Sequence, residues 1–186
     1  MSLDSIDIAP QESNETILRR AIIRLLARKP FFAHILQSMT HTYTEEIPTA
    51  GVFITLTTNL FINPKWFNVL TKEEQVAVLE HEVYHLMHRH ISRCISGTYD
   101  KILYNIAADI AINQHIHSLP EGSLMPETFA LPKDETTEFY YKKLKEFPLL
   151  KAKTVCTLDN HELWEKSKDF GNMIEARMKE LIKDAF

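Results

Sequence analysis

Residues 76–90 read VAVLEHEVYHLMHRH and contain an HExxH sequence that runs from His81 to His85. In a helix, residues four apart lie on one face about one turn apart, so both imidazoles can reach one metal ion while Glu82 lies beside them. Neutral imidazole is a good Zn²⁺ ligand, and a carboxylate that does not bind the metal can take a proton from an activated water molecule. The stretch therefore predicts a helix with a zinc-dependent hydrolytic site, in which His81 and His85 are metal ligands and Glu82 is the general base.

The residues that flank the HExxH sequence argue against a chance occurrence among the nine histidines of the chain. They are uncharged: Val78, Leu79, Val83, Tyr84, Leu86 and Met87. Such neighbours fit a helix that is buried across the middle of a domain, and not a solvent-exposed helix with stray histidines. A metal site is therefore favoured over a structural coincidence.

A capping box marks the start of this helix. Thr71 can cap the first turn while Glu74 reaches back to the Thr71 backbone, so the helix is predicted to begin near Lys72 and to run to about Ser92. On a helical wheel the apolar side carries Val76, Leu79, Val83, Leu86 and Met87, and the other side carries Val78, His81, His85 and His88. One face is thus predicted to pack in the core and the other to carry the ligands.

Two further histidines follow the motif. His88 shares the ligand face, but it lies too far along the axis to join a metal held by His81 and His85, so we expect it beside the site or at the mouth of the cleft. His90 points away from His85 as long as the helix continues, and it could bind the metal only if the backbone turned first. The Gly that allows such a turn in the HExxHxxGxxH sequence of metzincins is absent, and Ile91 stands at the third-histidine position. His90 is therefore expected to be a hydrogen-bonded structural histidine.

The third metal ligand is predicted on the next helix, because catalytic zinc usually has three protein ligands and a water molecule. Residues 100–119 read DKILYNIAADIAINQHIHSL and are apolar in their middle except for the row Asn105, Asp109 and Asn113. A buried carboxylate is costly unless it meets a cation or several donors. Asp109 is thus the predicted third ligand, and Asn105 and Asn113 are expected to orient the ligands.

Other assignments of these residues stay open from the sequence. Asp109 could instead cap a neighbouring turn or pair with Arg89 or Arg93. Cys94 lies close enough to the HExxH sequence to be a candidate ligand. Cys94 and Cys156 form no CxxC pair, which excludes a zinc ribbon, and both thiols are expected to be reduced.

The composition sets the broad class. With 186 residues, 45% hydrophobic and 25% charged, the chain suits a single globular domain (residues 1–186) with a substantial core. The formal net charge of -4 gives no general attraction to nucleic acid or to an anionic membrane. We find no secretory signal and no run that approaches the roughly 20 apolar residues that span a bilayer. We therefore expect a cytoplasmic protein with no nucleic-acid or membrane partner.

The remaining sequence predicts an α+β fold that is mainly helical, with a small sheet or hairpin beside the motif helix. Apolar residues recur at helical spacing from Glu15 to about Ser38, where Pro30 is expected to kink the helix or to divide it into two. Residues 50–57 (AGVFITLT) and 58–63 (TNLFIN) are rich in β-branched and aromatic residues and are predicted to be short strands.

The ends of the chain are less informative. Residues 1–14 are polar and expected to be flexible, and residues 150–186 are expected to form a C-terminal helical extension. Asp159 and His161 could fold back to the cleft as alternative metal or oxyanion residues. A helix start rich in Asp and Asn is usually a cap, which favours the structural interpretation.

The pattern HExxHxxxxHxxR from His81 to Arg93, followed by NxAxDxxIN from Asn105 to Asn113, is much more specific than HExxH alone. With the Pro-Phe-Phe element at 30–32 and the Asn-Pro turn at 63–64, it resembles the putative metallopeptidase domain that often precedes a von Willebrand factor A-like domain in bacterial and phage proteins. The resemblance covers roughly residues 15–145.

The resemblance implies a zincin-like metallopeptidase domain. It makes His81 and His85 metal ligands, Glu82 the base and Asp109 the acidic ligand. Peptide hydrolysis is the activity that it leads us to expect. Because the chain ends at Phe186, we expect a von Willebrand A-like or ATPase partner, if one is used, to act in trans.

Two functions are open from the sequence. In the first, the chain is a zinc metallopeptidase, and an edge strand around Val52 to Thr57 pairs with an extended peptide or protein substrate. In the second, the metal stabilises a catalytically silent module that binds a partner protein. Glu82 favours the first function, because a purely structural metal site needs no additional glutamate next to its first histidine. Candidates for stabilising the transition state are Tyr84, Tyr104 and His117.

Overall fold

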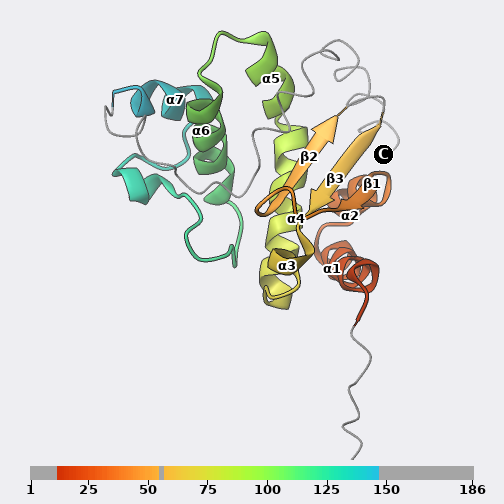
Figure 1. The fold of residues 1–186 in the computed structure, drawn as a ribbon. Coiled ribbons are helices and arrows are strands. Elements are labelled where there is room, and N and C mark those ends of the chain that lie inside the picture. Colours follow the sequence, from red (N-terminus) through yellow and green to blue (C-terminus); the bar gives the residue numbers. More distant parts are fainter. Residues whose placement is uncertain (1–11, 55–56, 147–186) are drawn as a thin grey trace, which may run out of the picture.

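The computed structural model describes residues 12–54 and 57–146, which form a mainly helical α+β fold (Figure 1). Within these ranges the elements are α1 (Asn14–Arg28), α2 (Pro30–Gln37), β1 (Thr40–Tyr43), β2 (Ala50–Ile54), β3 (Thr58–Ile62), α3 (Pro64–Phe67), α4 (Lys72–Met87), α5 (His90–Ser96), α6 (Lys101–Asn113) and α7 (Thr137–Leu144). A short 3-10 helix, Pro126–Phe129, lies between α6 and α7. The predicted fold class is confirmed.

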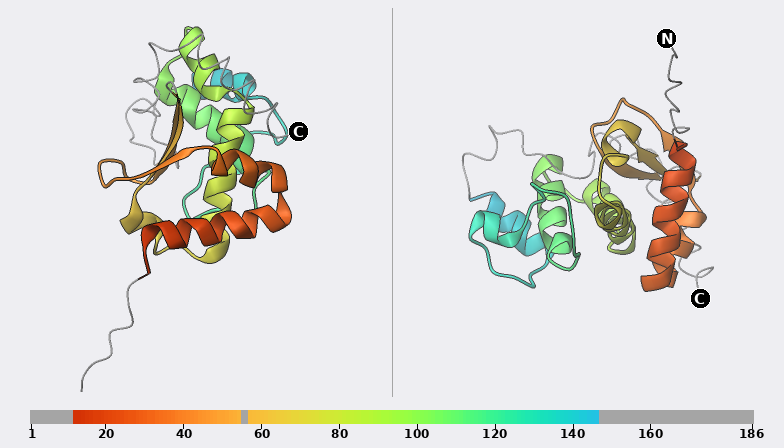
Figure 2. Two further views of the ribbon diagram at one scale, coloured as in Figure 1. Left: turned by 90° about the vertical axis from the view of Figure 1, so that its right-hand side faces the viewer. Right: turned by 90° about the horizontal axis from the view of Figure 1, so that it is seen from below.

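Helix α4 runs through the middle of this arrangement. Helices α1 and α2 and the sheet pack on one side of it, while α6 and α7 lie on the other (Figures 1 and 2). Every residue of α4 from Gln75 to Val83 is buried. The helix with the HExxH sequence is therefore buried across the middle of the fold, as the apolar flanks predict.

The start of α4 is the predicted capping box. The Glu74 backbone N–H donates to Thr71 Oγ1 at 3.2 Å, and the Thr71 backbone N–H donates to the Glu74 carboxylate at 2.8 Å. These reciprocal bonds satisfy two backbone donors that a helix start leaves unpaired, and such a cap stabilises a helix by about 1 kcal/mol. The first residue of α4 is Lys72, as predicted.

The end of α4 differs from the prediction. The helix stops at Met87 instead of continuing to about Ser92, and Arg89 adopts the left-handed conformation with φ 56° and ψ 33°. The chain then enters α5 at His90 in a new direction. A non-glycine residue in this conformation costs about 1–2 kcal/mol, so the surrounding packing must hold it. The prediction of one continuous helix is wrong. The sequence does not reveal the break, because no Gly or Pro occurs at this position.

Pro30 divides the N-terminal helical segment into two helices, which was one of the two predicted outcomes. Lys29 links them, and Pro30 occupies the first turn of α2, where its missing N–H carries no penalty. The Lys29 ammonium pairs with Glu80 of α4 and lies 5.1 Å from the ring centre of Phe32 and 5.2 Å from that of Tyr84. These contacts fix the junction of α1 and α2 against α4.

The sheet has the strand order β1-β3-β2. Strands β2 and β3 form an antiparallel pair from Ala50–Ile62 to Ile54–Thr58, close to the two predicted strands, although β2 ends at Ile54 and not at position 57. Strand β1 is parallel to β3 and was not predicted. Its sequence, THTY, is short, polar and only partly buried, so it carries no strand signal of its own.

Helix α6 carries the predicted polar row. It begins after Asp100, whose side chain accepts from the Leu103 backbone N–H at 3.1 Å, and it ends at Asn113, earlier than the predicted position 119. No helix within residues 12–54 and 57–146 has the length and hydrophobicity needed to span a membrane. The expected extension at 150–186, with Asp159 and His161, lies outside the described residues, as does most of segment 1–14.

Candidate metal centre

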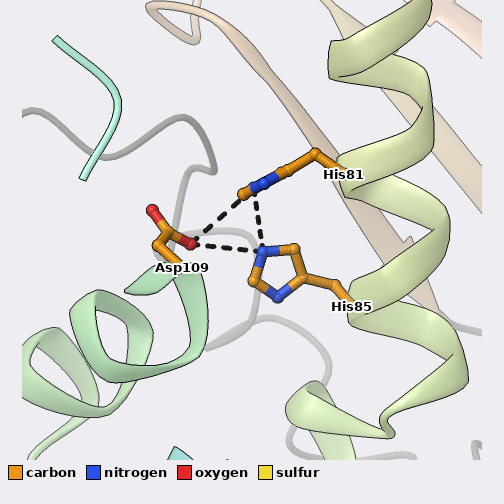
Figure 3. Close-up of side chains that lie close together, drawn as sticks. All are labelled: His81, His85 and Asp109. Atoms are coloured by element: carbon orange, nitrogen blue, oxygen red, sulfur yellow. Dashed lines mark hydrogen bonds and ion pairs between the residues drawn. The ribbon is translucent and has the colours of Figure 1, made fainter. Parts of the chain in front are cut away.

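Side chains from α4 and α6 converge on one point (Figure 3). His81 Nε2 and His85 Nε2 are 2.9 Å apart, and Asp109 Oδ1 lies 3.7 Å from the first nitrogen and 3.2 Å from the second. In a tetrahedral zinc site with metal–ligand distances of about 2.0–2.1 Å, the ligand atoms are about 3.3 Å from one another. The three separations bracket this value, so the donor set fits Zn²⁺ in both chemistry and spacing.

The electrostatics of the cluster also favour a cation. His81, His85 and Asp109 have no exposed surface. Burial lowers the pKa of His81 to about 4, to which the neighbouring His85 contributes, and burial lowers the pKa of His85 to about 3. Both imidazoles are therefore neutral at pH 7, and their contacts with Asp109 do not join opposite charges. A metal ion would add a positive charge beside a carboxylate that is buried against these two neutral imidazoles.

Asn113 orients His81 within the cluster. Asn113 Oδ1 lies 2.8 Å from His81 Nδ1, and Asn113 Nδ2 donates to the Leu124 carbonyl at 2.9 Å. Because the amide nitrogen is engaged by Leu124, the amide oxygen accepts from His81 Nδ1–H. His81 Nε2 then keeps its lone pair on the side of His85 and Asp109, which is the tautomer that binds a metal.

The other asparagine of the polar row behaves differently. Asn105 is completely buried, but its side-chain oxygen and nitrogen have no hydrogen-bond partner among the described residues. The expected contact between Asn105 and a ligand is therefore not present. The polar row predicts burial at all three positions, but an orienting hydrogen bond is seen only at Asn113.

His90 occupies a position that the sequence analysis missed. His90 Nδ1 lies 3.1 Å from His85 Nδ1, and His90 Nε2 lies 3.1 Å from Thr137 Oγ1 of α7. His90 is expected to point away from His85 only as long as the helix continues; the helix ends at Met87, and the left-handed Arg89 turns the chain and returns His90 to the site. His90 is buried and hydrogen-bonded, and it contacts the nitrogen of His85 that faces away from Asp109. Burial and the neighbouring His85 lower its pKa well below the ordinary value.

Glu82 follows His81 in α4 and is completely buried. Within the described residues, the group that could hold a metal ion comprises His81, His85 and Asp109, and Glu82 is not part of it. This arrangement agrees with a carboxylate that stands next to the ligands without being one.

The contacts of Cys94 and Arg93 do not support the alternative roles considered for them. Cys94 is buried, and burial raises the pKa of its thiol to about 11, so it is not a thiolate at neutral pH. Arg93 forms an ion pair with Glu138 of α7 instead of Asp109. His88 is exposed and stacks on His90, with ring centres 5.4 Å apart.

His88 also lines a cavity of about 320 Å³ next to the site. Its other walls include Arg93, His115 and residues 134–138, which precede or begin α7. His88 is expected beside the site or at the mouth of the cleft, and its contact with His90 lies beside the site.

A sequence profile of the family described as "Putative metallopeptidase domain" matches residues 13–166. The match includes every described helix and strand and all the residues of the His81, His85 and Asp109 cluster. A search of curated proteins and a search of solved structures returned no match.

Proposed function

This chain belongs to the putative metallopeptidase domain family, and from that premise we propose that it is a zinc-dependent metallopeptidase with Glu82 as general base. The single observation that carries the proposal is the convergence of His81, His85 and Asp109 at separations that suit a tetrahedral zinc site. When bound, Zn²⁺ would act as a Lewis acid that polarises the substrate carbonyl and makes water more acidic.

In this proposal, different residues bind the metal and transfer the proton. His81 and Asp109 lie close to His85 Nε2, so the three side chains would hold the ion from two helices. Glu82 would accept a proton from the attacking water molecule and later pass it to the leaving amine. Burial of the site excludes bulk water, which strengthens every electrostatic interaction within it.

An extended peptide is the substrate that the sheet could accommodate. Strand β2 is an edge of the β1-β3-β2 sheet within the described part of the chain, and it packs directly against α4. The backbone of an edge strand can pair with an extended peptide, while the side chains of the peptide enter neighbouring pockets. We propose that the residues of β2 around Val52 bind the substrate in this way.

The test compares Glu82→Gln with wild type. The amide keeps the size of the side chain but cannot accept a proton at neutral pH, so turnover should fall about 100-fold or more while zinc and peptide are still bound. Zinc content and cleavage of a peptide library would be measured on the same samples. Glu73→Gln, an exposed position in the first turn of α4, is the matched control and should keep full activity.

Three results would contradict the proposal. Equal activity of Glu82→Gln and wild type would exclude Glu82 as the base. A purified protein that binds no zinc would exclude the metal. A zinc-loaded wild type that cleaves nothing across a broad library would favour the alternative, a silent module that uses the metal to stabilise a protein-binding fold.

A further inference from the structure

A chain of hydrogen-bond contacts leads from the metal centre to the first turn of α7. We propose that His90 and Thr137 are positioning residues, which hold His85 in the tautomer that binds the metal. The inference rests on the proposed zinc site, and it assigns to α7 a role in setting the metal affinity of ligands on α4.

The contacts that carry the inference are all buried. His85 Nε2 faces His81 and Asp109, whereas His85 Nδ1 lies 3.1 Å from His90 Nδ1 on the opposite side of the ring. His90 Nε2 lies 3.1 Å from Thr137 Oγ1. His85 and His90 have no exposed surface, and Thr137 is 4% exposed, so water does not replace these contacts.

A metal ligand must offer a lone pair, and this requirement on His85 Nε2 determines which nitrogens of His85 and His90 carry protons. If His85 Nε2 binds the metal, the proton of this neutral imidazole must be on Nδ1. That N–H points at His90 Nδ1, which must then be the acceptor, so the proton of His90 is on Nε2. The His90 Nε2–H in turn donates to Thr137 Oγ1. Each donor in this chain of contacts has an acceptor, and His85 Nε2 keeps the lone pair that a metal ligand needs.

The opposite tautomer of His85 would close the site. With its proton on Nε2, His85 would donate to His81 Nε2 at 2.9 Å or to Asp109 Oδ1 at 3.2 Å, and this hydrogen bond would have to break before a metal could bind. His90 offsets this competition by giving the His85 Nδ1–H an acceptor, and Thr137 gives an acceptor to the Nε2–H that His90 then carries.

Each ligand histidine is therefore held by a hydrogen bond to its Nδ1, the ring nitrogen that does not face the metal position, and the two supports come from different helices. Asn113 of α6 orients His81, while Thr137 of α7 orients His85 through His90. Helix α7 packs on α6, so the two supports belong to one unit on the far side of α4 (Figure 1). The left-handed Arg89 makes the second support possible, because it returns His90 to the ligand face.

The experiment measures zinc affinity by competition with a chromophoric chelator for Thr137→Val, Thr137→Ser and His90→Phe. Loss of an outer hydrogen bond to a ligand typically weakens metal binding about 10- to 100-fold, which we expect for His90→Phe. Thr137→Val, one bond further away, should weaken binding about threefold to tenfold, and Thr137→Ser should restore it. Thr58→Val is the matched control, because Thr58 is buried and its hydroxyl has no hydrogen-bond partner among the described residues.

A second readout separates positioning from general stability. In the zinc-loaded protein, imidazole nitrogen NMR should report the His90 Nε2–H as hydrogen-bonded in wild type and in Thr58→Val, and as not hydrogen-bonded in Thr137→Val. Lower stability of Thr137→Val with unchanged zinc affinity and an unchanged His90 Nε2–H signal would mean that Thr137 is merely structural and would overturn the inference. Thr137→Val alone decides the matter if His90→Phe does not fold.

The outcomes also distinguish this inference from the proposed function. A wild type that binds no zinc would overturn the proposed function, and this inference with it. Tight zinc binding by wild type with the same affinity in His90→Phe and Thr137→Val would overturn the inference and leave the zinc site standing.

Discussion

The metal-free protein is expected to lose stability steeply in mild acid, because two ligand histidines are buried as neutral imidazoles. Burial lowers the pKa of His81 to about 4 and that of His85 to about 3, whereas histidine in an unfolded chain has a pKa of about 6.5. Below that value the unfolded chain binds protons that the folded protein does not. The free energy of unfolding therefore has its full value above about pH 6.5, and it decreases as the pH falls toward the folded-state pKa values.

The magnitude follows from these values. Each histidine contributes up to about 1.4 kcal/mol for each pH unit in this window, so the pair lowers the free energy of unfolding by about 4 kcal/mol between about pH 6.5 and about pH 4.5. A loss of this size is a large part of the roughly 5–15 kcal/mol that stabilises a typical domain.

The assay is denaturant unfolding of the chelator-treated protein at a series of pH values. His81→Asn removes one of three buried imidazoles with lowered pKa values, His81, His85 and His90, so its stability should depend about one third less steeply on pH than that of wild type. A free energy of unfolding that changes by less than about 1 kcal/mol over the window would refute the reasoning, because it would show that the folded protein protonates these histidines as readily as the unfolded chain does.

Three further predictions follow from single contacts. Asp109→Ala should weaken zinc binding by more than the roughly 100-fold that loss of an outer hydrogen bond costs, and wild-type affinity in a chelator competition would contradict its role as a ligand. Asn113→Leu leaves His81 Nδ1–H and the Leu124 carbonyl unpaired, so the free energy of unfolding should fall by about 1–3 kcal/mol for each group; an unchanged value in denaturant titration would mean that these bonds do not form. Arg89→Gly should be about 1–2 kcal/mol more stable than Arg89→Val, because only Gly adopts a positive φ without strain, and equal stabilities would show that position 89 is not left-handed.

The parts of the site that the sequence predicts are those set by helix geometry. The capping box at Thr71 and Glu74 places the start of α4, and the period of the helix then puts His81 and His85 on one face. Asp109 stands out as a carboxylate on an apolar helix, and the structure places it beside both imidazoles. These patterns are local, so they can be interpreted without knowledge of the tertiary fold.

The missed features depend on contacts between distant segments. No sequence signal marks the left-handed Arg89, because a non-glycine residue takes this conformation only when packing imposes it. The contacts of His90 with His85 and Thr137 follow from that turn and from the placement of α7. Strand β1 likewise owes its conformation to parallel pairing with β3, since its own residues are polar and few.

Complete burial of His81, His85 and Asp109 has a kinetic consequence for any ion that they hold. A chelator in solution cannot touch such an ion until the surrounding helices separate, so release is limited by a local opening of the fold. The release rate should rise with chelator concentration only at first and then level off at the rate of opening. The same opening would control entry of the ion and the access of a peptide substrate to it, so the rate of metal exchange reports how often α4 and α6 separate.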